Sequence, residues 1–428
     1  MSTYDTNMGI LCGGGPAPGL NALISAATSY AVKLNWKVIG FHYGYKYLAT
    51  GDPEIVKTNS IELKEDMVAD LSDQGGSIII PDRFNPTKSP TIISNVLNML
   101  YHFKIRYLLV VGGNDKIFST HLITQGVDPF QMSVIAVPKT IDNDIQLPPN
   151  QSTFGYHTAR AFASKLVMNL IEDARSAPRW FVIEMMGKNT GHLALSVANA
   201  TGAHLAVIPE DFGDHKVTLK DICDLIEGAI YKRKSQGKNY GVCIICEGLI
   251  NKMSQGSIQE LYQNGFIPTD RKGDIILDDV ELGRAVRNEI EKRMQQRMIP
   301  IRVTSKKIGY ELRGCSPSSF DAIYCTELGY GAVEGFKTNH SNCMVVWKNG
   351  KISYKSFRTL MDPETGAIVP RKVDVKSEPY KIARLYFWQM RPEDISDSSR
   401  LKRIADAARL TPNDFIIQFG HVPSLTVA

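Results

Sequence analysis

The sequence lacks long apolar runs, a strong excess of either charge and a paired set of cysteines. No stretch approaches the roughly 18 consecutive apolar residues that a membrane-spanning helix needs. The first seven residues have no basic stretch leading into an apolar core, so we expect no secretory signal. Over 428 residues, 49 Lys and Arg stand against 44 Asp and Glu. This net charge of +5 is too weak for a general nucleic-acid-binding surface, and we expect a cytoplasmic protein that contacts neither nucleic acid nor membrane.

Seven cysteines are scattered along the chain, and an odd number argues against a complete disulfide framework. Cys243 and Cys246 have the spacing of a metal-binding or redox pair. They lie in an apolar segment that is typical of a buried strand, Gly241-Val-Cys-Ile-Ile-Cys246. Residues three apart in a strand point to opposite faces of a sheet and are poorly placed to share a ligand. We therefore predict cysteines that pack in the core, in a reducing compartment.

Strand-like and helix-like segments alternate through the first two thirds of the chain. Short runs that are apolar on both faces, separated by helical stripes, indicate parallel sheets covered on two sides. The pattern occurs in both the first and the middle third, which predicts an α/β protein with two Rossmann-like lobes and mostly parallel sheets. The expected strands are 8–11, 36–41, 107–111, 133–137, 180–185, 204–208 and 241–245, and the expected helices are 20–34, 92–103, 154–172 and 400–410.

Three loops that follow predicted strands carry residues suited to phosphate chemistry. Glycines in 13–19 let the backbone approach a ligand, and the next helix offers free N–H groups to an anion. Gly112-Gly-Asn-Asp-Lys116 and Pro138-Lys-Thr-Ile-Asp-Asn-Asp144 follow two further strands, so all three loops should share one edge of the sheet. In the last loop one carboxylate can accept a hydroxyl proton while another helps to hold Mg²⁺ against a phosphate. The structural alternatives are a tight turn at 13–19 and an Asp-rich turn that caps a helix.

These loops, in this order, resemble the phosphofructokinase family and its pyrophosphate-dependent branch, over roughly residues 7–345. Three later segments extend the resemblance. Met186-Gly-Lys-Asn-Thr-Gly-His192 is similar to a sugar-phosphate segment, Glu247 matches a sugar-binding glutamate, and Gly309-Tyr-Glu-Leu-Arg-Gly-Cys-Ser-Pro317 is similar to a loop that grips a 6-phosphate. The resemblance implies a phosphofructokinase fold with the active site in the cleft between the lobes. The implied reaction is reversible phosphorylation of fructose 6-phosphate by pyrophosphate, in glycolysis or gluconeogenesis.

The resemblance also assigns roles to individual residues. Asp142 would take the proton from the C1 hydroxyl of the sugar, and Thr140 would orient it. Asp144 and Asn114 would hold Mg²⁺. Arg179 would reach into a neighbouring subunit's site, which implies a homodimer or homotetramer. The remaining implied contacts are Gly14, Gly15 and Asn114 for the donor, and Met186, Gly187, Lys188, Glu247, Tyr310 and Arg313 for the sugar phosphate.

Two positions bear on the phosphoryl donor. Relatives that use ATP have small glycines where this chain has Asp115 and Lys139. A carboxylate at Asp115 would repel a nucleotide triphosphate, and the Lys139 ammonium would neutralise charge on the transferred phosphoryl group. The alternative for Lys139 is a solvated surface lysine.

The chain departs from the branch pattern at several positions. Asn114 stands where the branch has a metal-binding aspartate, and we expect Lys116 beside it to supply the missing positive charge. Lys188 replaces an arginine, and Arg302, Lys306 or Lys307 would serve where an arginine is common near Thr304. These departures leave two alternatives: a catalytically weak paralogue that regulates or senses sugar phosphates, and an ATP-dependent enzyme.

The resemblance also divides the chain. It implies a pyrophosphate lobe of residues 1–152 with about 311–365, a fructose 6-phosphate lobe of residues 153–310, and a C-terminal extension of residues 366–428 that packs on the lobes.

Overall fold

The computed structural model describes residues 6–125, 127–269, 276 and 279–426. Contacts divide the chain into two compact units, and each consists of two separate segments. Unit 1 comprises Met1–Ala159 and Tyr310–Arg371, and unit 2 comprises Arg160–Gly309 and Lys372–Ala428. The boundaries differ from the predicted lobes, because residues 372–428 group with unit 2 instead of forming a third part. The assignment of each unit to one substrate stays a prediction.

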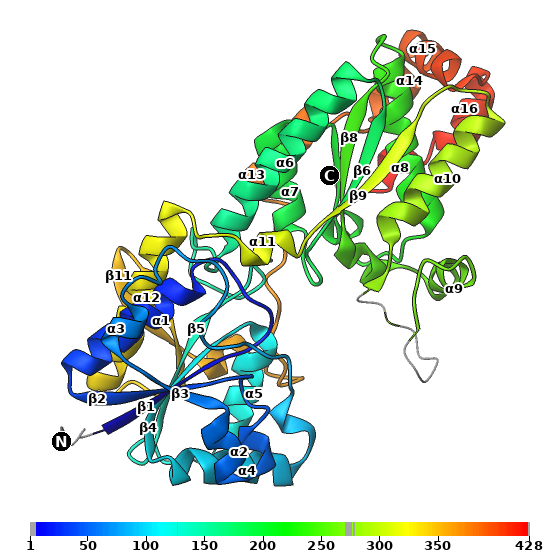
Figure 1. Ribbon diagram of the computed structural model, residues 1–428. Helices are drawn as coiled ribbons and strands as arrows, with labels where there is room; N and C mark the ends of the chain where they lie inside the picture. The colour runs from blue at the N-terminus through cyan, green and yellow to red at the C-terminus, as the bar shows by residue number, and fades with distance from the viewer. Residues whose placement is uncertain (1–5, 126, 270–275, 277–278, 427–428) are drawn as a thin grey trace. The chain divides into compact units, whose positions relative to one another are not determined.

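Unit 1 is built on a seven-stranded sheet in the order β11-β10-β5-β4-β1-β2-β3 (Figure 1). Five neighbouring strands run parallel, and β11 and β3 add antiparallel edges. The central strands are apolar and buried, as expected for a sheet covered on both faces. The strands are β1 (Thr6–Cys12), β2 (Trp36–Phe41), β3 (Ser60–Leu63), β4 (Ile105–Gly112), β5 (Ser133–Pro138), β10 (Cys343–Lys348) and β11 (Lys351–Ser356).

Helices cover both faces of this sheet. One face packs against the paired helices α1 and α12, and the other against α4 and α5. Three of the seven helices named below begin at a polar cap; the Ser89 hydroxyl, for example, accepts a hydrogen bond from the Ile92 N–H at 3.3 Å. The helices are α1 (Leu20–Lys33), α2 (Pro53–Thr58), α3 (Glu65–Val68), α4 (Pro90–His102), α5 (Asn114–Thr124), α11 (Glu311–Gly314) and α12 (Ser319–Lys337).

Unit 2 is built on a four-stranded parallel sheet in the order β7-β8-β6-β9. Helices α8 and α10 pack on each other and on one side of the sheet, and α6 and α7 lie on the other side (Figure 1). The strands are β6 (Trp180–Met185), β7 (Leu205–Val207), β8 (Gly241–Cys246) and β9 (Val303–Ile308). The helices are α6 (Tyr156–Ser176), within which the unit boundary falls, α7 (His192–Thr201), α8 (Leu219–Lys234), α9 (Gln255–Gln263) and α10 (Leu282–Gln296).

The C-terminal segment is fastened to unit 2 through buried polar contacts. The Tyr380 hydroxyl donates to Asp211 at 2.6 Å, and the ammonium of Lys232 lies 2.5 Å from Asp394. The segment contains four helices, α13 (Glu378–Tyr386), α14 (Pro392–Ser396), α15 (Ser398–Ala408) and α16 (Pro412–Phe419), where the sequence predicted one. It therefore belongs to the core packing of unit 2.

The predicted α/β class with mostly parallel sheets is confirmed. All seven cysteines are free, and Cys243 and Cys246 are buried in β8 as predicted. Within the described residues, no helix has the length and apolar character to cross a bilayer.

Candidate active site

Three strand ends of unit 1 meet at one edge of its sheet. In the parallel register Cys12 pairs with Val111 and Gly112 pairs with Pro138. The loops that follow β1, β4 and β5 therefore begin side by side, as the sequence predicts. The Gly13 N–H donates to the Val111 carbonyl at 2.8 Å, which ties the first loop to the second strand.

The glycine loop leaves room for basic side chains. Gly14 has a φ of +81°, and a Cβ there would lie 3.2 Å from the Lys139 ammonium. A Cβ on Gly15 would lie 3.3 Å from the Arg313 guanidinium. Glycine at these positions therefore lets two cations approach the backbone of the loop.

Lys139 is buried at the centre of this edge, with only 5% of the residue exposed. Its ammonium donates to the Gly15 carbonyl. Burial lowers the pKa of Lys139 to about 8; Arg313 and Arg83 lower it further, while Cys12 and Asp142 act in the opposite direction. None of these three basic side chains has a carboxylate within 4 Å among the described residues. The edge thus holds a cluster of positive charge without an ion pair among the described residues, and the alternative of a solvated Lys139 is wrong.

The loop after β5 is held in shape by local hydrogen bonds. The Thr140 hydroxyl accepts from the Asp142 N–H at 3.0 Å, and the Thr140 carbonyl accepts from the Thr153 hydroxyl at 2.6 Å. Asn143 adopts a φ of +58°, and its side-chain oxygen accepts from the Thr153 N–H at 3.2 Å and lies 3.5 Å from the Arg371 guanidinium. These contacts fix the backbone of the half-buried Asp142 from both sides.

Asn114 and Asp144 lie together, as the sequence predicts. The Asn114 amide donates to the Asp144 carbonyl at 3.0 Å, and the Asp144 side chain is almost fully buried. The Asn114 side-chain oxygen is buried and has no hydrogen-bond partner among the described residues. Among all the residues that the structure describes, no cluster of three or more His, Cys, Asp or Glu side chains is suited to a metal. Mg²⁺ commonly takes only one or two protein oxygens and completes its shell with phosphate and water, so this pair fits the ion.

The two residues after Asn114 differ in burial. Asp115 is exposed in the first turn of α5. Lys116 is buried, and its ammonium donates to the Phe84 carbonyl. Burial lowers the pKa of Lys116, and Asp82 and Asp115 oppose this shift. Because its ammonium is used by a backbone carbonyl, Lys116 connects two loops, and this contact does not support the predicted role of replacing metal charge.

The sugar-phosphate candidates of unit 2 gather at the end of β6. Met186 is buried, and the Gly187 N–H donates to the Glu247 carboxylate at 3.1 Å. Lys188 is exposed beside them, and its carbonyl accepts from the Asn251 amide at 2.8 Å. A Cβ on Gly187 would lie 2.4 Å from the Thr190 carbonyl, which explains glycine at this turn.

Two sets of candidates lie elsewhere. Arg179 immediately precedes β6, whereas Met186 immediately follows it, so the two stand at opposite ends of a six-residue strand. The Arg179 guanidinium donates to the Ala177 carbonyl at 3.1 Å and lies 3.6 Å from Asp173. Tyr310 and Arg313 belong to unit 1, where the Arg313 guanidinium lies 5.3 Å from the centre of the Tyr310 ring.

The comparisons with known proteins agree with this geometry. The family model described as Phosphofructokinase matches residues 7–336. The chain belongs to the phosphofructokinase family. It is 38% identical to a pyrophosphate--fructose 6-phosphate 1-phosphotransferase of Thermotoga maritima, over 98% of this chain and 99% of that protein. It is 36% identical to a protein of the same name from Naegleria fowleri, over 97% of this chain and 95% of that protein.

The fold is likewise that of phosphofructokinases. A solved pyrophosphate-dependent phosphofructokinase from Marinobacter aquaeolei superposes with a TM-score of 0.65 at 16% identity, over 89% of this chain and 90% of that one. The predicted resemblance to the family is thus confirmed, together with its fold.

Two residues that support the phosphofructokinase site come from outside its motifs. Arg83 is exposed and directly follows Asp82, whose backbone forms an isolated β-bridge with Gly13. Its guanidinium adds to the positive charge around Lys139. Arg371 donates to the Gln151 carbonyl at 2.6 Å and approaches Asn143. Neither has a local pattern that signals its role, because both act through contacts distant in sequence.

Proposed function

We propose that this phosphofructokinase transfers a phosphoryl group from pyrophosphate to the C1 hydroxyl of fructose 6-phosphate. The products are fructose 1,6-bisphosphate and phosphate. The observation that carries the proposal is the cluster of Lys139, Arg313 and Arg83 at the glycine loop. Cations without carboxylate partners favour anions, and both substrates carry phosphate. The two full-length relatives, whose names give this reaction, support the same conclusion.

In the proposed reaction the C1 oxygen forms a bond to one phosphorus of pyrophosphate as the bridging P–O bond breaks. The proton of the C1 hydroxyl passes to the Asp142 carboxylate, and the second phosphate leaves with the bridging oxygen. Lys139 neutralises charge on the transferred group, while Arg313 and Tyr310 hold the 6-phosphate. Most of the acceleration then comes from positioning and from fixed positive charge.

The site also fits Mg²⁺, which phosphoryl-transfer enzymes commonly use. The Asp144 carboxylate and the buried Asn114 side-chain oxygen would hold it. When bound, the ion supplies further neutralisation of phosphate charge. The amide of Asn114 is a weaker ligand than a carboxylate, so we propose weak binding of the ion in the absence of pyrophosphate.

Replacing Asp142 with Asn tests the role of the base. The variant keeps the shape of the side chain but cannot accept the proton, so kcat with pyrophosphate should fall by about 10²–10⁴-fold with little change in KM for the sugar phosphate. Steady-state rates of fructose 1,6-bisphosphate formation measure the effect. Wild-type protein that binds fructose 6-phosphate without turnover would instead support the regulatory paralogue.

We further propose a homodimer or homotetramer in which Arg179 completes the site of a neighbouring subunit. Its position at the far end of β6 from Met186 supports this, because it keeps the guanidinium away from the sugar candidates of its own unit. Mixing Asp142→Asn with Arg179→Ala subunits tests it. Shared sites predict recovery of about a quarter of wild-type activity at low fructose 6-phosphate, since half of randomly mixed dimers carry one intact site of two. Unchanged activity on mixing would contradict it.

A further inference from the structure

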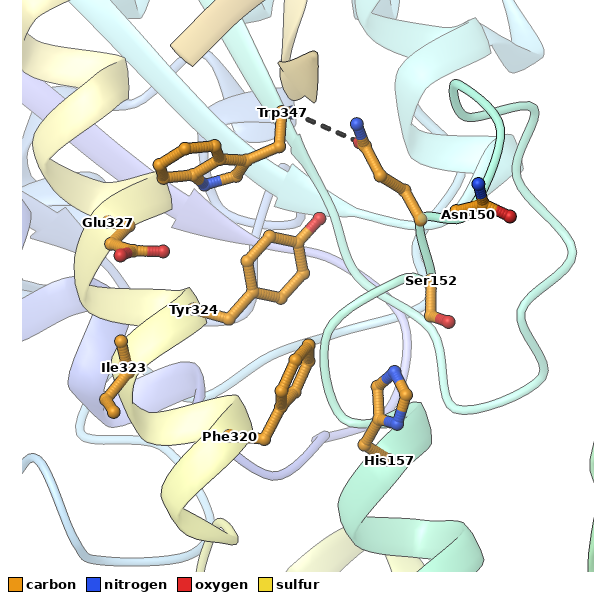
Figure 2. Close-up of a pocket in the computed structure, with 9 residues that line it drawn as sticks. Asn150, Ser152, His157, Phe320, Ile323, Tyr324, Glu327 and Trp347 are labelled. Atoms are coloured by element: carbon orange, nitrogen blue, oxygen red, sulfur yellow. Dashed lines mark hydrogen bonds between the residues drawn. The ribbon is translucent and has the colours of Figure 1, made fainter. Parts of the chain in front are cut away.

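A cavity lies in unit 1, between α12 and the loop that precedes α6 (Figure 2). It has a volume of about 290 Å³, and none of its lining residues is among the candidates for the phosphoryl-transfer site. Aromatic side chains form much of its wall: Phe320 and Tyr324 from α12, Trp347 from β10 and His157 from the start of α6. The centres of the Phe320 and His157 rings are 4.2 Å apart.

Two polar atoms in this wall have no hydrogen-bond partner among the described residues. They are the Tyr324 hydroxyl and the Trp347 indole N–H. Only 8% of Tyr324 is exposed. A buried hydroxyl without a partner costs free energy, so a ligand in the cavity that accepts its hydrogen bond would be stabilised there. In Figure 2 the Tyr324 hydroxyl points away from α12, toward the side of the cavity formed by the loop 150–152.

The only acidic side chain that lines the cavity, Glu327, has no ion pair in the described part of the chain. Its half-buried position raises its pKa, and burial is the only resolved cause. The other carboxylates on the same helix differ. Asp321 accepts hydrogen bonds from the Gly155 and Thr158 N–H groups, and Glu334 accepts from the Tyr30 hydroxyl. The cavity thus combines a lone carboxylate with electron-rich rings, and no Lys or Arg lines it.

We propose that this cavity binds a small organic cation, an ammonium or guanidinium group, that carries a neighbouring hydrogen-bond acceptor. The ring faces of Phe320, Tyr324 and Trp347 attract the cation, and Glu327 supplies the opposite charge. The acceptor of the ligand takes the hydrogen bonds of the Trp347 N–H and the Tyr324 hydroxyl. Such a group can belong to a free amine or to a basic side chain of a second copy of this chain.

Choline is a suitable probe, because 3,3-dimethylbutan-1-ol has the same shape without the charge. Titration of the whole protein, followed by calorimetry and by Trp fluorescence, should show saturable binding of choline and at least about tenfold weaker binding of the neutral isostere. Glu327→Gln should weaken choline binding about tenfold. The exposed Glu364 gives a matched control, since Glu364→Gln removes one charge from the same unit outside the cavity. Trp347→Phe should remove the fluorescence change.

A second measurement tests whether the cation belongs to a basic side chain of a second copy of this chain. If a basic side chain of another copy fills the cavity, sedimentation velocity should show a smaller assembly for Glu327→Gln than for wild type and Glu364→Gln. Tyr324→Phe serves as a stability control. Because it removes a hydroxyl that has no hydrogen-bond partner among the described residues, its melting temperature should equal or exceed that of the wild type. Equal affinity for choline and its isostere, with assembly unchanged by Glu327→Gln, would overturn the proposal. Turnover with pyrophosphate should be the same in all these variants.

Discussion

At the residue scale, Lys139 has a charged ammonium in a buried position beside two other cations. Burial lowers its pKa to about 8, so a large fraction of the lysine is charged at neutral pH in spite of the loss of solvation. The arrangement lowers the stability of the free protein and favours a bound polyanion. Arg313 and Arg83 also lower the stability of the free protein, because each is repelled by the Lys139 ammonium. A bound phosphate would neutralise this repulsion.

The titration of Lys139 predicts opposite effects of pH on binding and on stability. Above pH 8 the ammonium loses its proton, so kcat/KM for pyrophosphate should fall by about tenfold per pH unit. The folded-state pKa lies below the ordinary lysine value of 10.5, so the unfolded chain binds more protons between pH 8 and 10.5. This group therefore makes the free protein more stable as pH rises through that window.

Rate profiles and urea unfolding from pH 7 to 10 measure both effects. Lys139→Met is the control, since it should remove the lysine-dependent slope from both curves and lose most activity. A kcat/KM for pyrophosphate that stays flat to pH 10 in the wild type would contradict the role of this ammonium.

At the element scale, the first βα loop shows how glycine sets the spacing of helices. Gly19 has a φ of +95° immediately before α1, and a Cβ there would lie 2.3 Å from the Cys325 sulfur on α12. A Cβ on Gly13 would similarly lie only 2.1 Å from the Lys116 Cγ. The close approach of α1 and α12 therefore depends on a residue without a side chain.

Gly19→Ala should destabilise the protein by about 2–4 kcal/mol, through both the positive φ and the contact with Cys325. Gly256→Ala provides the control, because Gly256 is exposed in α9 and a Cβ there meets nothing within 4 Å. The control should be neutral or stabilising by up to about 1 kcal/mol. Urea unfolding of both variants gives the comparison, and equal free energies of unfolding would refute this account of the loop.

The same scale shows which elements could be predicted from the sequence. Strands with apolar residues on both faces, such as β4, β5, β6 and β8, were predicted within two residues. The edge strand β7 was predicted as well, but the edge strands β3, β9 and β11 were missed, together with β10. β9, with the sequence Val-Thr-Ser-Lys-Lys-Ile, pairs with β6 alone, so polar residues are tolerated at its open edge. The predicted helix at 400–410 exists as α15, but the polar composition around it concealed three companions.

For the candidate site, the sequence motifs predicted which residues lie close together, because each motif follows a strand and the ends of parallel strands meet at one edge of the sheet. Asn114 beside Asp144 and Lys139 beside the glycine loop follow from the order of parallel strands. Arg371 could not be predicted in this way. Its position depends on tertiary contacts with Gln151 and Asn143, and an isolated arginine in a polar segment has no periodic pattern.

At the scale of the whole molecule, each unit is made of two chain segments, with unit boundaries at residues 159/160, 309/310 and 371/372. Unit 2 needs the C-terminal segment to complete it, since Tyr380 and Asp394 bond to buried partners there. Unit 1 carries the cationic edge and the separate aromatic cavity. We therefore expect the phosphoryl donor to bind in unit 1.

The most direct test of the account compares pyrophosphate with ATP as donor. Initial rates of fructose 1,6-bisphosphate formation should be measured at pH 7 with saturating fructose 6-phosphate and Mg²⁺, varying each donor in turn. We expect Asp115 to repel a nucleotide triphosphate and the cationic edge to favour the smaller anion, so kcat/KM for pyrophosphate should exceed that for ATP by at least about 100-fold. A kcat/KM for ATP equal to or greater than that for pyrophosphate would contradict the account.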